Sequence, residues 1–367
     1  MASMPDRPLP VQDHGGNTRQ VCARLGLKQV LDFSASINPL GQPPGLREHL
    51  FDHWDEVAHY PDRDCAALVA TLAAHHGVPP ECLVAGNGSA ELLALLLRAL
   101  SPRRLLLAPP DFGLYREVAP PGLPVLEIPR REQHAFALDV PALVGAVRPG
   151  DLVLLSNPGN PSGHYSPPQD LAALYAACTE REAHLAVDEA FADFQDGPTC
   201  LPRVPIDPYL IVLRSLTKFY GIPGLRLGFL AAAPEPAAAV RRLLIPWSVN
   251  ALAQRAGRYC VADAHWPGRT VAAVAELRRD LSAALAALPG LVPLASAANY
   301  LLVALEPPAP PADRLYAALA QRGVLVRHCG SFGLGQRYLR MAVRPADENR
   351  RLLATLAELL CQPETVR

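Results

Sequence analysis

Short runs of apolar and β-branched residues alternate with segments of helical periodicity along most of the chain. The apolar runs predict strands at residues 104–108, 151–156, 184–188, 209–214 and 226–232. Periodic apolar positions predict helices at residues 64–76, 89–100 and 169–179. Strands that alternate with helices in this way form βαβ units, so the pattern predicts an α/β fold.

A different pattern starts with a long amphipathic stretch at about residues 268–288. Predicted strands near residues 299–305, 323–327 and 337–343 follow it, and a helix near residues 346–361 closes the chain. Proline-rich segments such as PPGLP and EPPAPP mark loops between elements. We therefore predict an N-terminal arm with part of a small domain at residues 1–48, a large domain at residues 49–267, and the C-terminal small domain at residues 268–367.

Composition narrows the expected partner to a small molecule. The 367 residues include 34 Lys and Arg and 35 Asp and Glu, which gives a formal net charge of −1. No basic stripe is present that nucleic acid or an anionic membrane would bind. The eight cysteines are scattered without a CxxC pair, which argues against a disulfide framework and against a metal site of the zinc type. Neither a signal-peptide core nor an apolar run of membrane-spanning length is visible, so we expect a soluble, unprocessed, cytoplasmic protein.

The segment LRSLTKFYGIPGLRLG, which starts at residue 213, carries the strongest chemical signal. It places Lys218 three residues after Ser215 and eight residues before Arg226. A lysine that forms a Schiff base must present an uncharged amine to a carbonyl, and a phosphate on that carbonyl compound needs hydroxyl and guanidinium donors. Together with Thr217, these residues resemble the cofactor-lysine segment of the pyridoxal-phosphate enzymes of aminotransferase class I and II. A buried loop lysine that pairs with a neighbour is the alternative.

Pyridoxal phosphate also requires a carboxylate at its ring nitrogen, since an adjacent negative charge keeps that nitrogen protonated. Asp188, in the run HLAVDEAF, is the candidate. It ends a predicted strand, and the carboxyl ends of strands open into the ligand crevice of an α/β sheet. An aspartate that caps the next helix is the alternative.

Three further motifs fit the remaining needs of this cofactor. AGNGSAELL starts a predicted helix whose free N–H groups can bind phosphate, SNPGNPSG offers an amide to the ring's phenolic oxygen, and PDFGLY offers an aromatic ring for stacking. An ordinary helix cap, a plain turn and a packed aromatic residue are the respective alternatives. The candidate residues are Gly88, Ser89, Ala90, Asn160 and Phe112.

The order and spacing of these motifs resemble the fold type I aminotransferase family over nearly the whole chain. The resemblance implies a large domain with a mostly parallel sheet flanked by helices, a smaller α+β domain, and pyridoxal 5'-phosphate as cofactor. It assigns Lys218 to the Schiff base, Asp188 to the ring nitrogen, Asn160 to the phenolic oxygen, Phe112 to ring stacking, and Gly88, Ser89, Ala90, Ser215 and Arg226 to the phosphate.

Two other positions bear on this resemblance. Tyr60, in HYPDRD, matches a tyrosine that reaches the cofactor phosphate of the neighbouring subunit, which implies a homodimer with shared active sites. Phe191 departs from the pattern, because many members carry a tyrosine there that bonds the phenolic oxygen. That oxygen is therefore expected to depend more heavily on Asn160.

Within the family, the ends of the chain resemble the threonine-phosphate decarboxylases of cobalamin biosynthesis, which are relatives of histidinol-phosphate aminotransferases. The motifs are DHGGN, DFSASINPLG, VDEAF and LVRHCGSFGLGQRYLRMAVR. The resemblance implies decarboxylation of L-threonine O-3-phosphate to (R)-1-amino-2-propanol O-2-phosphate. It assigns the substrate phosphate to His14, Gly16, Asn17 and Arg327, and the α-carboxylate to Arg340 assisted by Asn38. A disordered tail is the alternative for His14.

The residues alone leave the reaction open. A decarboxylase holds the bond from Cα to the carboxylate perpendicular to the cofactor ring, whereas an aminotransferase holds the Cα–H bond there, and a sequence does not reveal this torsion. A histidinol-phosphate or related amino acid aminotransferase is the second hypothesis. A catalytically idle relative that binds the cofactor is the third, and the intact Lys218 and Asp188 argue against it.

Overall fold

The structure is a computed structural model that describes residues 14–361, so the start of the predicted N-terminal arm lies outside the described residues. The chain divides into two compact units. The larger unit comprises Ile37–Ala275 and Ser296–Ala298, and the smaller one comprises the described residues up to Ser36, Glu276–Ala295 and the described residues from Asn299 on. These divisions fall 12 residues before and 8 residues after the boundaries drawn from the sequence pattern at 48 and 267.

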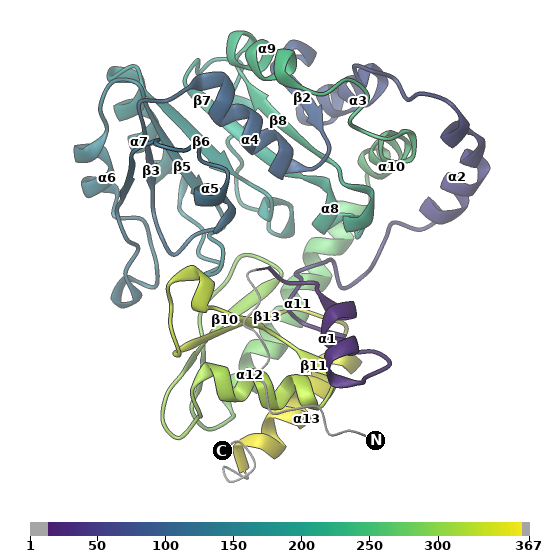
Figure 1. The fold of residues 1–367 in the computed structure, drawn as a ribbon, viewed down its shortest axis with the longest axis vertical. Helices are drawn as coiled ribbons and strands as arrows, with labels where there is room; N and C mark the ends of the chain where they lie inside the picture. Colours follow the sequence, from purple (N-terminus) through teal and green to yellow (C-terminus); the bar gives the residue numbers. More distant parts are fainter. Residues whose placement is uncertain (1–13, 362–367) are drawn as a thin grey trace. The chain divides into compact units, whose positions relative to one another are not determined.

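The larger unit is built on a seven-stranded sheet with the order β2-β8-β7-β6-β5-β3-β4 (Figure 1). The five strands from β7 to β4 are parallel to one another, and β8 is antiparallel to both β7 and β2. The strands are β2 (Leu83–Gly86), β3 (Arg104–Leu107), β4 (Val125–Glu127), β5 (Asp151–Ser156), β6 (His184–Asp188), β7 (Leu210–Ser215) and β8 (Gly228–Ala232). This mixed, mostly parallel sheet confirms the predicted α/β class.

Helices flank the sheet, and the central strands are therefore almost entirely apolar. Every residue of β5 and β7 is buried. Leucines of α4 pack with β5 and with Val240 of α9 in one apolar core. The helices are α2 (Leu46–Asp52), α3 (Ala66–His76), α4 (Ser89–Leu100), α5 (Leu114–Glu117), α6 (Val140–Ala146), α7 (Pro168–Glu180), α8 (Leu216–Phe219), α9 (Pro234–Leu243) and α10 (Ala251–Ala262).

The smaller unit has an antiparallel four-stranded sheet with the order β12-β13-β10-β9, and a separate parallel pair formed by β1 and β11. Its strands are β1 (Leu31–Asp32), β9 (Leu291–Pro293), β10 (Tyr300–Leu305), β11 (Val324–Leu325), β12 (Arg327–His328) and β13 (Tyr338–Ala342). Its helices are α1 (Thr18–Leu25), α12 (Ala312–Gln321) and α13 (Ala346–Cys361), and α11 (Trp266–Ala286) contributes to both units. Among residues 14–361, no helix is long and apolar enough to cross a membrane.

The carboxyl ends of the parallel strands collect polar residues at one edge of the large sheet. Ser156 ends β5, Asp188 ends β6 and Ser215 ends β7. Ser156 and Asp188 are direct partners in the register of β5 and β6. Ligands of open α/β sheets bind at this edge, so the topology places the candidate site there.

Candidate active site

Lys218 lies immediately beyond the end of β7. The strand ends at Ser215 and the one-turn helix α8 begins at the next residue. The Nζ atom of Lys218 donates to Ser215 Oγ over 3.2 Å, and that oxygen lies 2.8 Å from Thr217 Oγ1. The same Nζ lies 5.2 Å from the centroid of the Phe191 ring. The structure thus joins the predicted lysine to both predicted hydroxyls and sets it over the phenylalanine that replaces the family's tyrosine.

Asp188 is a buried carboxylate with its oxygens already oriented. Oδ2 accepts a hydrogen bond from the Tyr115 hydroxyl over 2.8 Å, and Oδ1 accepts one from the Ala190 N–H over 3.0 Å. Burial raises the pKa of Asp188, and the charge of Lys218 opposes that rise. A cationic ring nitrogen would oppose it further, because an opposite charge favours the ionised carboxylate.

The N-terminus of α4 and Arg226 form a candidate anion-binding cup. The helix begins at Ser89, after Gly88 with a φ of +90°, a conformation that favours glycine. A Cβ atom on Gly88 would lie 2.6 Å from Arg226 Nη2, so the guanidinium packs directly against this turn. A Cβ atom on Gly228 would lie 2.7 Å from Ser89 N. Gly88, Ser89 and Arg226, three of the residues predicted to bind phosphate, therefore lie together at the N-terminus of a helix, where N–H groups and a guanidinium favour an anion.

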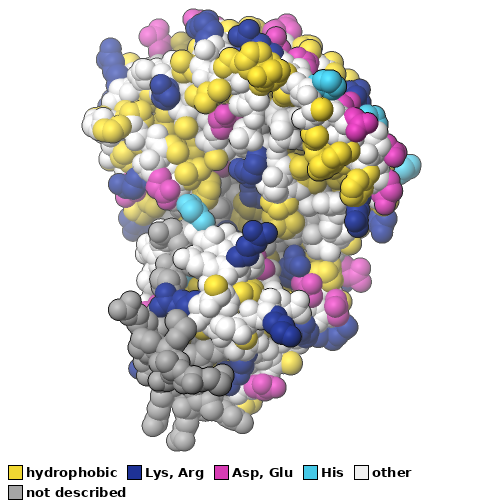
Figure 2. Space-filling model, turned by 45° about the vertical axis from the view of Figure 1, so that its right-hand side comes forward, with side chains coloured by type: hydrophobic (Ala, Val, Ile, Leu, Met, Phe, Trp, Pro, Cys, Tyr) yellow, Lys and Arg dark blue, Asp and Glu magenta, His cyan; other side chains and the backbone are white. Residues whose placement is uncertain are grey.

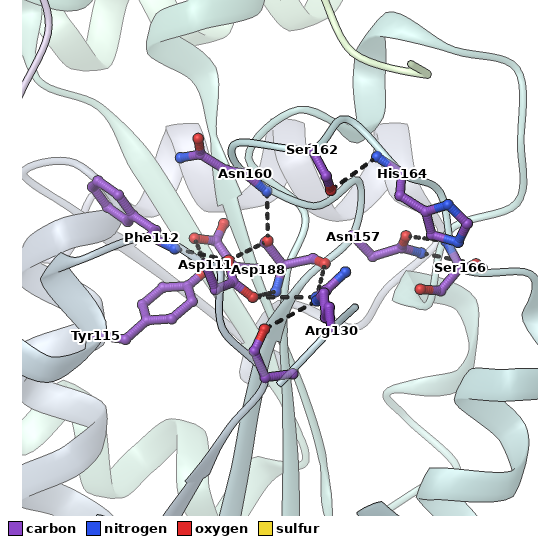
Figure 3. Close-up of polar contacts among 12 residues, drawn as sticks. Asp111, Phe112, Tyr115, Arg130, Asn157, Asn160, Ser162, His164, Ser166 and Asp188 are labelled. Carbon is purple, nitrogen blue, oxygen red and sulfur yellow. Dashed lines mark hydrogen bonds and ion pairs between the residues drawn. The ribbon is translucent and has the colours of Figure 1, made fainter. Parts of the chain in front are cut away.

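Phe112 and Asn160 approach this edge from the turns after β3 and β5. The Phe112 ring lies 5.7 Å from the Tyr115 ring in an edge-on arrangement. Asn160 is buried, and its backbone N–H donates to Ser156 Oγ over 3.0 Å. Figure 3 shows Phe112, Tyr115 and Asp188 grouped on one side of the close-up, with Asn160 above them. The assignments of stacking to Phe112 and of the phenolic oxygen to Asn160 remain predictions.

Tyr60 lies away from this cluster on an exposed surface of the larger unit. It is 84 % exposed, and its ring lies 5.2 Å from the ring of Trp247. Phe51 and Trp54 are also large exposed apolar side chains of this unit. Figure 2 shows such apolar side chains in patches on one face of the protein. Exposed apolar patches of this kind mark interaction surfaces.

The smaller unit contains a pair of buried arginines. Arg327 of β12 and Arg340 of β13 are direct partners across the two strands, and both are nearly inaccessible. Both guanidinium carbons lie over the Phe332 ring, at 5.0 and 6.0 Å from its centroid. Like charges directly opposite each other destabilise a sheet, and burial lowers the pKa of Arg340. An anionic ligand would offset both effects.

The other predicted substrate residues divide between the units. The Gly16 N–H donates to Ser34 Oγ over 2.9 Å, and Arg340 Nη2 donates to the Ser34 carbonyl over 2.9 Å, so Ser34 joins the N-terminal segment to the arginine. His14 and Asn17 are exposed. In the larger unit, Asn38 Nδ2 donates to the Phe219 carbonyl over 2.6 Å.

Asn38 therefore supports the backbone that carries the lysine. Its N–H also donates to the Lys218 carbonyl over 3.0 Å, and its Oδ1 accepts from the Leu40 N–H over 2.9 Å. The amide of Asn38 is thus already bonded within the protein. Its assignment to the substrate carboxylate remains a prediction.

The sequence analysis did not identify the residues that hydrogen-bond to the site residues or to their neighbours. They are Tyr115, Asp111, Arg130 and Ser156. Tyr115 follows Phe112 by three residues, a spacing that puts both on one side of a helical turn, and Ser156 ends a predicted strand beside that of Asp188. Those two signals were available. Arg130 gave none, because its role depends on contacts with distant segments.

Comparison with known proteins places the chain in a family. The family model for aminotransferase class I and II matches residues 28–356. The chain belongs to this family. It is 40 % identical over 354 residues to threonine-phosphate decarboxylase of Salmonella typhimurium, with 95 % of this chain and 96 % of the relative covered. It is 33 % identical to histidinol-phosphate aminotransferase of Oleidesulfovibrio alaskensis, with 93 % and 90 % covered.

Solved structures of lower identity share the fold. Histidinol-phosphate aminotransferase from Clostridium acetobutylicum matches with a TM-score of 0.85 at 24 % identity, covering 91 % of this chain and all of the other. L-Threonine-O-3-phosphate decarboxylase from Porphyromonas gingivalis matches with a TM-score of 0.81 at 23 % identity, covering 90 % and 99 %. These likenesses confirm the predicted fold type I architecture.

Membership of this class makes the chain a pyridoxal-phosphate enzyme, as predicted. The residues present fit that cofactor. Asp188 offers a buried carboxylate, the start of α4 with Arg226 offers an anion cup, and Lys218 offers the amine. The carboxylate suits the cationic ring nitrogen, the anion cup suits the phosphate, and the amine suits the aldehyde.

Proposed function

We propose that the protein decarboxylates L-threonine O-3-phosphate to (R)-1-amino-2-propanol O-2-phosphate and CO₂, a step of cobalamin biosynthesis. The observation that carries the proposal is the 40 % identity, over 95 % of the chain, to a threonine-phosphate decarboxylase. The buried arginine pair of β12 and β13 supports it, because this substrate has two anionic groups. Incubation with this substrate alone, with CO₂ as readout, is the test.

Histidinol-phosphate aminotransferase activity is the second candidate. Its support is the 33 % identity to such enzymes over most of the chain. An aminotransferase must pass the amino group to a keto acid before it can turn over again, whereas a decarboxylase needs no second substrate. Dependence on 2-oxoglutarate therefore separates the two candidates.

The mechanism assigns one task to each group. When bound, pyridoxal phosphate supplies an electron-poor ring that accepts the electron pair released from the substrate's Cα. Asp188 would hold a proton at the ring nitrogen, and Lys218 would hold the cofactor through its Nζ. Arg340 orients the carboxylate that leaves as CO₂. Lys218 Nζ then delivers a proton to Cα, so one carbon–carbon bond is exchanged for one carbon–hydrogen bond.

Arg327 is assigned to the substrate phosphate, with His14, Gly16 and Asn17. Its guanidinium is held in place by a 2.6 Å bond to Ser331 Oγ and by the Phe332 ring. We expect Arg327→Ala to raise KM for the phosphorylated substrate by roughly 10- to 1000-fold, as the loss of a charge-assisted contact implies. Cofactor affinity is expected to stay unchanged.

Steady-state kinetics and a cofactor titration check this expectation. Arg337→Ala is the control, since that arginine is exposed on the same unit. If the Arg327 variant instead loses cofactor while KM stays constant, the residue has been assigned the wrong phosphate.

The active enzyme is proposed to be a cytoplasmic homodimer in which Tyr60 contributes to the partner's site. The support is the 84 % exposure of Tyr60 within a surface that also exposes Trp54 and Trp247. Mixing inactive Lys218→Ala subunits with inactive Tyr60 variants should restore activity, because one site of each mixed dimer then carries both native residues. An absence of recovery despite measured subunit exchange would contradict the shared site.

A further inference from the structure

A buried ion pair lies beneath the residues assigned to the cofactor ring. Arg130 Nη2 lies 3.2 Å from Asp111 Oδ2, and the two side chains are 0 % and 5 % exposed. Arg130 Nε also donates to the Ala108 carbonyl over 3.1 Å, and Nη2 donates to the Ser156 carbonyl over 3.1 Å. The guanidinium thus ties the segment after β4 to the ends of β3 and β5.

Asp111 is saturated with hydrogen bonds. It accepts from the Phe112 N–H over 2.8 Å, from the Ser156 N–H over 3.0 Å and from the Ser156 hydroxyl. A buried ion pair is stable only when hydrogen bonds satisfy most of its remaining polar atoms, and removal of one partner leaves an uncompensated charge. Within this pair, Nη1 of Arg130 is the one nitrogen without a hydrogen-bond partner among the described residues. The Asp111–Arg130 pair is therefore a fixed, buried element of the fold.

Hydrogen bonds connect this pair to the ring residues. Ser156 Oγ accepts from the Asn160 N–H over 3.0 Å, and Asp111 itself fixes the backbone of Phe112. Three residues after Phe112, Tyr115 donates to Asp188. Figure 3 shows dashed contacts that join Asp111 with Arg130 and Phe112. One network therefore fixes the backbone of Phe112 and Asn160 and, through Tyr115, the carboxylate of Asp188.

Arg130 also packs against the turn that carries Asn160. A Cβ atom on Gly159 would lie 2.9 Å from Arg130 Nη1 and 2.6 Å from Ser162 Oγ. The space that a side chain at residue 159 would need is already occupied. A side chain at residue 159 would therefore displace the guanidinium or the turn.

The charges of the pair affect Asp188. Burial raises the pKa of Asp111, and Arg130 opposes that rise. The Asp111 carboxylate in turn contributes to the raised pKa of Asp188. Without the Arg130 cation, the negative charges of Asp111 and Asp188 would repel each other, and one of the two carboxylates would bind a proton.

We propose that Asp111 and Arg130 are a positioning pair for the cofactor ring, in which Arg130 offsets the second carboxylate so that the negative charge at the ring nitrogen belongs to Asp188 alone. The pair touches neither substrate nor reacting atoms, and it acts through Phe112, Asn160 and Asp188. The proposal rests on the cofactor of the proposed function and is independent of the reaction catalysed.

The test compares Asp111→Asn, Arg130→Lys and the double variant Asp111→Asn/Arg130→Met. The readouts are the dissociation constant of pyridoxal phosphate from the refilled apoenzyme and the pH midpoint of the bound cofactor's visible absorbance. Arg116→Met is the matched control, because Arg116 forms an exposed ion pair with Glu127 in the same region. Circular dichroism checks that each variant is folded.

Asp111→Asn leaves Arg130 as a lone buried cation, which disfavours the protonated form of the bound cofactor. We expect its pH midpoint to fall by about half a unit or more. The double variant restores charge balance, so its midpoint should return close to that of the wild type, while its dissociation constant stays about tenfold or more above it. Arg130→Lys should keep the midpoint and weaken binding, and Arg116→Met should change neither quantity.

A midpoint that does not move in Asp111→Asn, or that moves equally in the double variant, would overturn the charge-balancing role. If Asp111→Asn does not fold, a wild-type midpoint and wild-type affinity in Arg130→Lys would overturn the positioning role. A wild-type protein that binds no pyridoxal phosphate would instead refute the proposed function itself. Absence of decarboxylation with normal cofactor binding would leave this inference intact.

Discussion

Lys218→Ala should lower kcat by about 10⁴-fold or more, because we assign to this residue both the attachment of the cofactor and the delivery of the proton to Cα. Its Nζ donates a hydrogen bond of 3.2 Å to Ser215 Oγ, at the end of β7. Single-turnover and steady-state assays of the variant measure the loss. Lys28→Ala, at an exposed position of the smaller unit, should keep wild-type activity.

The chain offers an unusually clean control for the covalent role. Lys28 and Lys218 are its only lysines. Borohydride reduction of the holoenzyme followed by peptide mass analysis should place the pyridoxyl group on Lys218. An adduct on Lys28 would refute the assignment.

Asp188→Asn is expected to have the second largest effect. The substitution keeps the shape of the side chain but removes the negative charge to which we assign the proton at the ring nitrogen, so kcat should fall by roughly 10²- to 10⁴-fold. KM should change much less. Tyr115→Phe removes only the 2.8 Å hydrogen bond to Asp188 and leaves the carboxylate, so its loss should be about tenfold at most.

Steady-state kinetics of the two variants, with the absorbance of the bound cofactor, make this comparison. Equal losses in both variants would mean that the orientation of Asp188 matters more than its charge. Retention of more than about a tenth of wild-type kcat in Asp188→Asn would contradict the assigned role.

Local pattern predicted the central elements well because their burial is regular. β6 covers the predicted residues 184–188, and the predicted helix at 89–100 is α4. β8 begins at Gly228, two residues after the predicted start, because Arg226 has a φ of +60° that a strand does not adopt. β2 and β4, which have four and three residues, were not predicted.

Partner choice in a sheet is non-local, and the sequence could not show it. The single strand predicted at residues 323–327 is two strands, β11 and β12. β11 pairs with β1, whereas β12 pairs with β13, so the two belong to different sheets. This division is what sets Arg327 directly opposite Arg340.

The motifs predicted residues that the structure brings together at the edge of the large sheet, but not the residues that support them. Arg130 is buried, whereas the adjacent Arg131 is exposed, and nothing in the run PRRE distinguishes the two. The difference arises from Asp111, 19 residues earlier, and from Ser156, 26 residues later. Contacts over such separations exist only in the folded chain.

The central claim is that the reaction is a decarboxylation, and the amount of CO₂ released per subunit tests it most directly. With L-threonine O-3-phosphate as sole substrate, we expect many equivalents of CO₂ per subunit, matched by aminopropanol phosphate and unaffected by 2-oxoglutarate. A single turnover that stops with pyridoxamine phosphate, and resumes only when 2-oxoglutarate is added, would contradict the account and identify an aminotransferase.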